Sequence, residues 1–340
     1  MNASPERPLS KEQTVTVSSG WAMLTLNLAL FIALPFIASA GAPLLIAVTV
    51  VWTVTSSALR APPLMLLGKY AAKPAIPFLA SLALLGTGIA GALAPYLAVT
   101  LRDVDPRVPF AVASIVLVLT TLGMISAERK LASAPEAPSP PVRAFGTMTA
   151  TATVFALGMI VLALGYQMHF AIDSAPLFLR FAPPGELQWL MPVFWIGFNI
   201  SMFPASVITN RLGGYTVMGI AGLIGAFAIL GAHFAQGLGL LIVAQAAAGA
   251  AWGAILMSAF TVAFAIGANG GEGRMSGLLF STLALATLAR MATVATGLNG
   301  DPTLKAVLQW TPTLCWAIAG AALLYLAVAG VRRWAAETPS

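Results

Sequence analysis

Residues 238–267 read LGLLIVAQAAAGAAWGAILMSAFTVAFAIG, a stretch with no Asp, Glu, Lys or Arg. About 17 to 25 mostly apolar residues are enough for a helix to cross the hydrocarbon core of a bilayer. The whole chain shares this character, because 59% of its 340 residues are hydrophobic and 8% are charged. A soluble domain carries about 25% charged residues. The sequence therefore predicts an all-α integral membrane protein.

Ten stretches of this kind indicate about ten transmembrane helices. They cover residues 21–40, 43–67, 75–100, 108–127, 147–172, 188–208, 215–234, 238–267, 276–298 and 308–331. The second is the least regular, because Arg60, Pro62 and Pro63 interrupt it. It either ends near Leu59 or continues as a kinked helix.

Polar segments divide these spans into two predicted bundles. Residues 1–20 form a polar tail, and residues 128–146 form a linker that contains Glu128-Arg129-Lys130 and then APEAPSPP. Prolines without apolar periodicity are typical of a linker. The predicted domains are therefore a four-span N-terminal bundle over 21–127, a six-span C-terminal bundle over 147–331, and a short tail over 332–340.

Basic residues indicate the orientation of the chain. Of the 17 Lys and Arg residues, twelve lie on the connections that share a side with the N-terminus, four lie on the opposite connections, and Arg290 lies within a span. Cytoplasmic loops carry the excess of Lys and Arg. We therefore expect both termini in the cytoplasm and the protein in the cell (inner) membrane. The net charge of +6 follows from this bias, so it does not indicate a nucleic-acid partner.

Two motifs carry a resemblance to a known family. At the inside connection after the sixth span, residues 206–218 read SVITNRLGGYTVM. In the third span, residues 84–97 read LLGTGIAGALAPYL, with glycines that let helices approach closely and a proline that bends one. With two bundles joined by a basic linker, the chain resembles the major facilitator superfamily, which has two six-helix halves and a substrate site at the midplane.

The resemblance implies roles for particular residues. The family's G-x-x-x-D-R-x-G-R-R loop is matched at Arg211 and Gly213, with Asn210 in place of the Asp and no trailing basic pair. The resemblance implies that Asn210, Arg211 and Gly213 form a tight cytoplasmic gating turn. The ten spans then correspond to family helices three to twelve, and the first two family helices have no counterpart. Three explanations stay open: a shortened record of a longer protein, a natural ten-helix variant completed by a partner, or a degenerate remnant.

Arg290 is the clearest functional candidate, because an ionisable group inside a membrane is costly and is functional by default. It lies near the middle of the ninth span, with Thr287 and Thr293 three residues to either side. The guanidinium could bind an anionic or zwitterionic solute, pair with an acid on another helix, or reach an interface. These alternatives stay open at the level of sequence.

Tyr166, His169 and Asp173 follow at i, i+3 and i+7 near the end of the fifth span, a spacing that places them on one helical face. His is the side chain that changes charge near neutral pH, so His169 is a candidate carrier of a coupling proton. The alternative for Asp173 is a solvated position at the start of an outer DSAP turn.

Three further polar or aromatic residues lie within spans: Trp195 and Asn199 in the sixth span, and Gln245 in the eighth. Amide side chains in a membrane need hydrogen-bond partners, so Asn199 and Gln245 are expected to face the bundle interior. Two roles stay open for these amides: they contact the solute, or they form hydrogen bonds that hold two helices together. The GAAWG segment at 249–253 is expected to be packing, since small residues four apart favour close helix contacts.

Enzyme motifs are absent from the sequence: it has no GxSxG, no HExxH and no Walker GxxxxGK[ST]. With two His and one Cys, we expect no metal site, no cofactor and no enzymatic activity. The expected function is secondary active transport of a small solute by alternating access, with a coupling proton as a candidate second partner. The alternative is a non-transporting membrane scaffold or assembly factor with the same fold.

Overall fold

The computed structural model describes residues 25–37, 40–58, 71–132, 150–267 and 271–337. All regular elements in these ranges are helices. Eight helices in this part of the chain are long and apolar enough to cross a membrane. They are Ile76–Thr100, Arg107–Ala127, Ala150–Phe178, Pro184–Leu212, Gly214–His233, Leu238–Gly267, Glu272–Ala295 and Ala306–Ala329. The protein is thus an all-helical, multi-pass membrane protein, as its composition predicts.

These eight helices correspond to the last eight predicted spans. The first two predicted spans are described in part, as a helix over Thr25–Ile37 and as α2 (Ala42–Ala58). Arg60, the rest of the second span, the tail over 1–20 and linker residues 133–146 lie outside the described residues. At the C-terminus, α13 (Pro302–Glu337) continues through most of the predicted tail.

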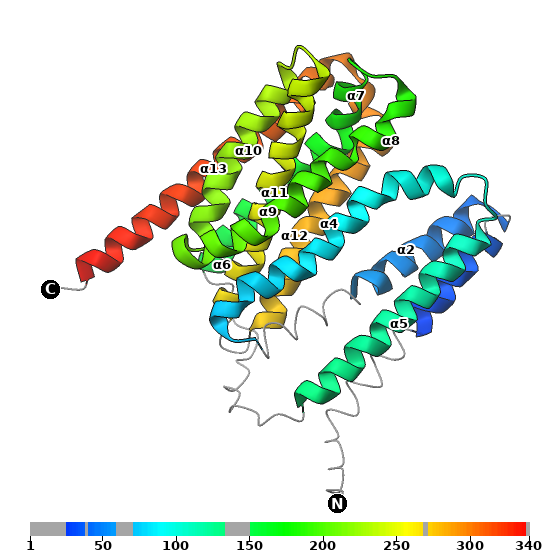
Figure 1. Cartoon of the computed structure of the whole chain (residues 1–340), viewed down its shortest axis with the longest axis horizontal. Helices are drawn as coiled ribbons and strands as arrows, with labels where there is room; N and C mark the ends of the chain where they lie inside the picture. Colours follow the sequence, from blue (N-terminus) through cyan, green and yellow to red (C-terminus); the bar gives the residue numbers. More distant parts are fainter. Residues whose placement is uncertain (1–24, 38–39, 59–70, 133–149, 268–270, 338–340) are drawn as a thin grey trace, which may run out of the picture. The chain divides into compact units, whose positions relative to one another are not determined.

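The described helices fall into two compact units (Figure 1). Unit 1 contains the helix Thr25–Ile37, α2 and α5 (Arg107–Ala132). Its interior is held by Asn27, whose Nδ2 donates to Oγ1 of Thr55 at 3.0 Å. The Phe31 ring lies between the rings of Trp52 and Phe110. Its centroid is 5.1 Å from that of Trp52 and 4.7 Å from that of Phe110. One aromatic contact on each side thus joins all three helices.

Unit 2 contains the remaining described helices. The long ones are α4 (Ile76–Thr100), α6 (Ala150–Met168), α9 (Pro192–Leu212), α10 (Gly214–His233), α11 (Leu238–Gly267), α12 (Glu272–Ala295) and α13. Short elements join them: η2 (Lys73–Ala75), η3 (His169–Asp173), α7 (Ser174–Phe178), η4 (Pro184–Glu186), α8 (Leu187–Leu190) and η5 (Leu298–Gly300). Of these helices, α11 has the largest share of buried residues, which places it at the centre of the unit.

Glycines let α9 and α11 approach backbone to backbone. A Cβ on Gly197 would collide with the carbonyl of Ala246, and one on Gly249 would collide with the carbonyl of Phe194. A Cβ on Gly253 would collide with the Ser201 hydroxyl and would lie 2.8 Å from the Phe198 carbonyl oxygen. The small residues at 249 and 253 therefore pack within the chain, which confirms the packing role expected for GAAWG.

Trp316 organises the other side of the bundle. Its ring is fully buried, and a Cβ on Gly225 of α10 or on Gly165 of α6 would collide with it. Its Nε1 donates to the carbonyl of Leu162 at 2.8 Å. One side chain of α13 thus fills the space that two glycines leave on α6 and α10, and the hydrogen bond fixes its orientation.

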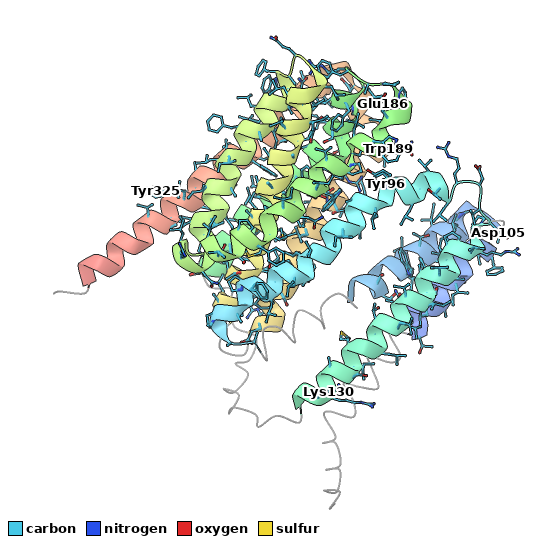
Figure 2. All side chains as sticks on the ribbon, viewed as in Figure 1. Tyr96, Asp105, Lys130, Glu186, Trp189 and Tyr325 are labelled. Carbon is cyan, nitrogen blue, oxygen red and sulfur yellow. The ribbon has the colours of Figure 1, made fainter. Side chains whose placement is uncertain are left out.

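The α4 helix packs on the C-terminal helices. Gly88 and Gly91 face α9, because a Cβ on either would collide with Asn199 or Trp195. Near the other end of α4, the ring of Tyr96 lies 4.9 Å from that of Trp189 on α8. Figure 2 labels both residues. The compact units therefore differ from the bundles predicted by chain order, in which residues 75–100 belong with the N-terminal spans.

Candidate functional site

The segment Ala150–Phe178 contains a π-helical turn near its end. Residues His169–Asp173 form η3, and the backbone N–H of Ser174 donates to the carbonyl of His169, five residues earlier. The hydroxyl of Ser174 donates to the same carbonyl at 2.9 Å. Single π turns inside α-helices occur frequently at functional sites. Here the wide turn carries two of the predicted site residues, His169 and Asp173.

His169 and Gln245 meet in the interior of the bundle, and both are fully buried. Nε2 of His169 lies 3.0 Å from Oε1 of Gln245, which also accepts the hydroxyl of Ser174 at 3.3 Å. Since an amide oxygen accepts, this geometry places the imidazole proton on Nε2. Nδ1 of His169 and Nε2 of Gln245 remain buried without a hydrogen-bond partner among the described residues.

Tyr166 lies one turn before His169, in an aromatic cluster. Its ring stacks on Trp252 of α11, with centroids 4.3 Å apart and planes 4° apart. Three more rings surround it within the same cluster: Phe170, Phe194 and Trp195. The Trp252 ring in turn lies 6.1 Å from that of Trp316. Aromatic stacking therefore joins α6, α9, α11 and α13 at one level of the bundle.

Arg290 lies on α12, beside the same part of α6. One turn earlier on α12, Oγ1 of Thr287 accepts a hydrogen bond from Nε2 of Gln167 at 2.8 Å. Nε of Arg290 is buried and has no hydrogen-bond partner in the described part of the chain. The Arg290 side chain is therefore partly buried rather than fully exposed.

Asp173 and Asn199 each hold a buried oxygen with no partner. Oδ2 of Asp173 lies at the end of the π turn, and the helix continues beyond it as α7, so Asp173 does not begin an exposed turn. Oδ1 of Asn199 lies against Gly88 of α4. Asn199 thus faces the bundle interior, as predicted, and lies at the contact between α4 and α9.

The connection between α9 and α10 is a tight turn. Gly213 has φ +82°, a conformation that side-chain-bearing residues rarely adopt, and its N–H donates to the carbonyl of Thr209. Nδ2 of Asn210 donates to the carbonyl of Pro74 at 3.3 Å, and Arg211 is exposed in the last turn of α9. Asn210 therefore ties this turn to the segment that leads into α4.

A cavity of about 500 Å³ lies close to this turn, away from the buried cluster. Its lining comes from α6, α10 and α11: Thr151, Gly214, Tyr215, Thr261, Val262, Ala265 and Ile266. A second cavity of about 310 Å³ lies in unit 1 beside Phe36 and Arg107. Within the described ranges, no group of three His, Cys, Asp or Glu residues is placed to hold a metal ion.

Ser174 and Gln167 belong to the site, although the sequence analysis does not select them. Ser174 lies in the DSAP segment, which has the composition of a turn, and only the π turn brings its hydroxyl to His169 and Gln245. Gln167 is polar within an apolar run. An amide side chain within an apolar run is also the feature that selects Gln245, so the same criterion identifies Gln167.

The seven predicted site residues lie on α6, η3, α9, α11 and α12 of unit 2. Contacts join His169 to Gln245, and Tyr166 to Trp195. Comparison with protein-family models gives no match, and comparison with curated proteins gives none. The residues and their surroundings are therefore the basis for any functional conclusion.

Proposed function

We propose that the protein is a secondary active transporter of the major facilitator type in the cell (inner) membrane. In this proposal it moves a small anionic or zwitterionic solute by alternating access. Both termini are cytoplasmic, and the ten spans correspond to family helices three to twelve. The motifs at 84–97 and 206–218 and the basic loops on one side support this proposal.

One observation carries the proposal: among the described residues of unit 2, seven buried polar side-chain atoms lack a hydrogen-bond partner, and five of these atoms belong to predicted site residues. These five are Nδ1 of His169, Oδ2 of Asp173, Oδ1 of Asn199, Nε2 of Gln245 and Nε of Arg290. A polar group buried without a hydrogen bond costs roughly 1 to 3 kcal/mol, judged from protein mutations. A polar solute that binds among these groups would recover that energy.

The positive charge of Arg290 favours a solute that carries a negatively charged group. Guanidinium groups bind carboxylates through two parallel hydrogen bonds, and such bonds are stronger in a dry interior than in water. In the proposal, the solute's acidic group binds Arg290. The tie between Gln167 and Thr287 holds α12 against α6 and so positions the guanidinium.

His169 is the candidate for proton coupling. Its Nε2 is held by Gln245, and its Nδ1 is buried without a hydrogen-bond partner among the described residues. In the proposal, Nδ1 takes up the coupling proton when the transport cycle opens the site to water. An imidazole can bind a second proton and release it when its surroundings change. In the proposal, a gradient of protons or of the solute supplies the driving force.

A non-transporting scaffold is the second candidate, and the aromatic cluster favours it. Rings of Tyr166, Trp252, Phe194 and Phe170 pack on one another where a transporter needs space for solute. A scaffold requires no change of Arg290 exposure and no solute. Uptake measurements therefore separate the two functions.

Uptake into proteoliposomes tests the proposal. Vesicles with the purified protein are incubated with a defined mixture of small carboxylates and the twenty common amino acids, with and without an inward proton gradient. Mass spectrometry then measures their contents. We expect at least one solute to accumulate above the level in protein-free vesicles, and Arg290→Gln to abolish that excess.

Arg274→Gln is the matched control, because Arg274 lies on the same helix and is exposed. This control should retain uptake. If no solute accumulates in any vesicle, the transporter proposal fails and the scaffold becomes the better account. Equal losses in both arginine variants would show a general effect of charge rather than a binding role for Arg290.

A further inference from the structure

We infer that unit 1 binds an anionic phospholipid, with the head-group phosphate on Arg107 and part of one acyl chain in the cavity that Arg107 lines. This cavity, of about 310 Å³, lies between the helix Thr25–Ile37 and α5. Pockets that hold small ligands measure about 300 to 1,000 Å³, so this one has room for part of one chain. The inference concerns a bound lipid rather than a transported solute, so it stands or falls separately from the proposed transport.

The walls of this cavity are apolar. Three residues of the first helix and three of α5 supply the apolar lining: Ile32, Pro35, Phe36, Phe110, Ala111 and Ile115. Among the described lining residues, Ser114 is the one polar residue besides Arg107, and its hydroxyl already donates to the carbonyl of Phe110 at 2.8 Å. Water stays in a cavity only where polar groups bind it. A cavity of this kind in a membrane helix pair is therefore suited to hydrocarbon.

The cavity is also open to the surroundings of unit 1. Ile32, Phe36 and Ile115 line it and are all exposed, so their side chains are accessible from outside the helix pair. Both helices are apolar, and α5 has the length and composition of a membrane span. A lipid chain of the bilayer can therefore enter the cavity from the side.

Arg107 supplies a positive charge in the lining. Its guanidinium lies over the ring of Phe36, 4.9 Å from the ring centroid. The backbone N–H of Arg107 donates to Oδ1 of Asp105 at 2.9 Å, but the guanidinium itself makes no hydrogen bond or ion pair within the described residues. The Phe36 ring thus holds the guanidinium beside the cavity and leaves its N–H donors available to an anion.

The place of Arg107 along the helix favours a lipid phosphate as that anion. The candidate span begins at Arg107, and the end of a span lies near the level of the lipid head groups. Guanidinium groups bind phosphate through paired, charge-assisted hydrogen bonds, and basic pockets between membrane helices bind anionic head groups. A zwitterionic head group would bring an ammonium group toward the guanidinium, and like charges repel. An anionic phospholipid therefore matches both the charge and the apolar walls.

Native mass spectrometry of the full chain in nonionic detergent micelles tests the inference. The protein is titrated with dioleoylphosphatidylglycerol, which is anionic, and with dioleoylphosphatidylcholine, which has the same chains and is zwitterionic. We expect the anionic lipid to bind at the lower concentration. Arg107→Gln should weaken its binding at least about fivefold, the factor that corresponds to one basic residue at a membrane surface.

Arg102→Gln is the matched control, because Arg102 is exposed on the connection before α5 and does not line the cavity. It should leave the affinity for the anionic lipid unchanged. Ala111→Phe fills the cavity without a change of charge, so it should weaken binding of the same lipid. All variants should elute as monodisperse protein, so a loss from misfolding is recognised.

Four results would overturn the inference. They are equal binding of the two lipids, equal losses in the two arginine variants, unchanged binding in Ala111→Phe, and binding of oleate as tight as that of the anionic phospholipid. The last result would identify a fatty acid as the occupant.

Discussion

Arg290 and its neighbours show where the chain places side chains that are costly to bury in a membrane. A guanidinium in a span is tolerated where it faces protein or water rather than lipid. The hydrogen bond from Gln167 to Thr287 holds α6 and α12 together one turn away from Arg290. His169 lies deeper, with Gln245 as its partner on α11. Gln167 and His169 thus each have a hydrogen-bond partner on another helix that fixes their position.

At this scale, Gln245→Leu should destabilise the folded protein. The substitution removes the acceptor of His169 and of Ser174, so a buried imidazole loses its hydrogen bond. Leaving a buried donor unpaired costs about 1 to 3 kcal/mol. The free energy of unfolding in mixed micelles should fall by this amount. Gln188→Leu, which changes an exposed hydrogen bond to Gly185, should have a much smaller effect, and equal losses would contradict the buried role of Gln245.

The types of the site residues could be predicted from sequence, but their partners could not. Polarity inside an apolar run selects Arg290, His169 and Gln245, because such residues are costly in lipid. The bond between His169 and Gln245 joins residues 76 apart, and no local pattern encodes that distance.

The helices themselves owe their packing to small residues. In lipid, apolar side chains gain little from contacting each other rather than lipid, so close backbone approach supplies much of the attraction. Gly197, Gly249 and Gly253 provide that approach between α9 and α11. Gly219, Gly222 and Gly320 do the same between α10 and α13. These pairs form the framework that positions the site.

Gly249→Val should therefore separate α9 from α11. The added atoms would collide with the backbone of Phe194, which cannot rotate away as a side chain can. Overpacking a tight interior costs about 1 to 3 kcal/mol and sometimes more. We expect a lower free energy of unfolding and a lower yield of monodisperse protein. Gly239→Val on the same helix meets open space, so a similar loss in that variant would contradict the argument.

Apolar runs predict the existence of elements well, but they miss irregular turns. Each of the last eight predicted spans has a helix of matching position. The π turn at His169–Asp173 was not predicted, because helical spacing assumes 3.6 residues per turn and one extra residue shifts the following face. For this reason Ser174 was not recognised as a partner of His169.

The whole molecule is a multi-pass membrane protein, and its basic loops predict its orientation. The connection near Glu186 is predicted to be outside, and the turn at Gly213 inside. Alkaline phosphatase needs an oxidising compartment for its disulfides, so it reports the side of a fusion point. Fused after Glu186 in a bacterial host it should be active, and fused after Gly213 it should be inactive. The reverse pattern would contradict cytoplasmic termini.

Water access to Arg290 tests the central claim most directly, because a solute site must open to water while a structural or lipid-facing arginine need not. The lone cysteine is first removed by Cys315→Ala, and single cysteines are introduced by Arg290→Cys and Leu288→Cys, Leu288 being 62% exposed on the outer surface of the same helix. Both are treated with a membrane-impermeant, charged methanethiosulfonate reagent. The account predicts that position 290 reacts at least about tenfold faster, since a thiolate forms in water and not in lipid. Equal rates, or no reaction at position 290, would contradict a solute site at Arg290.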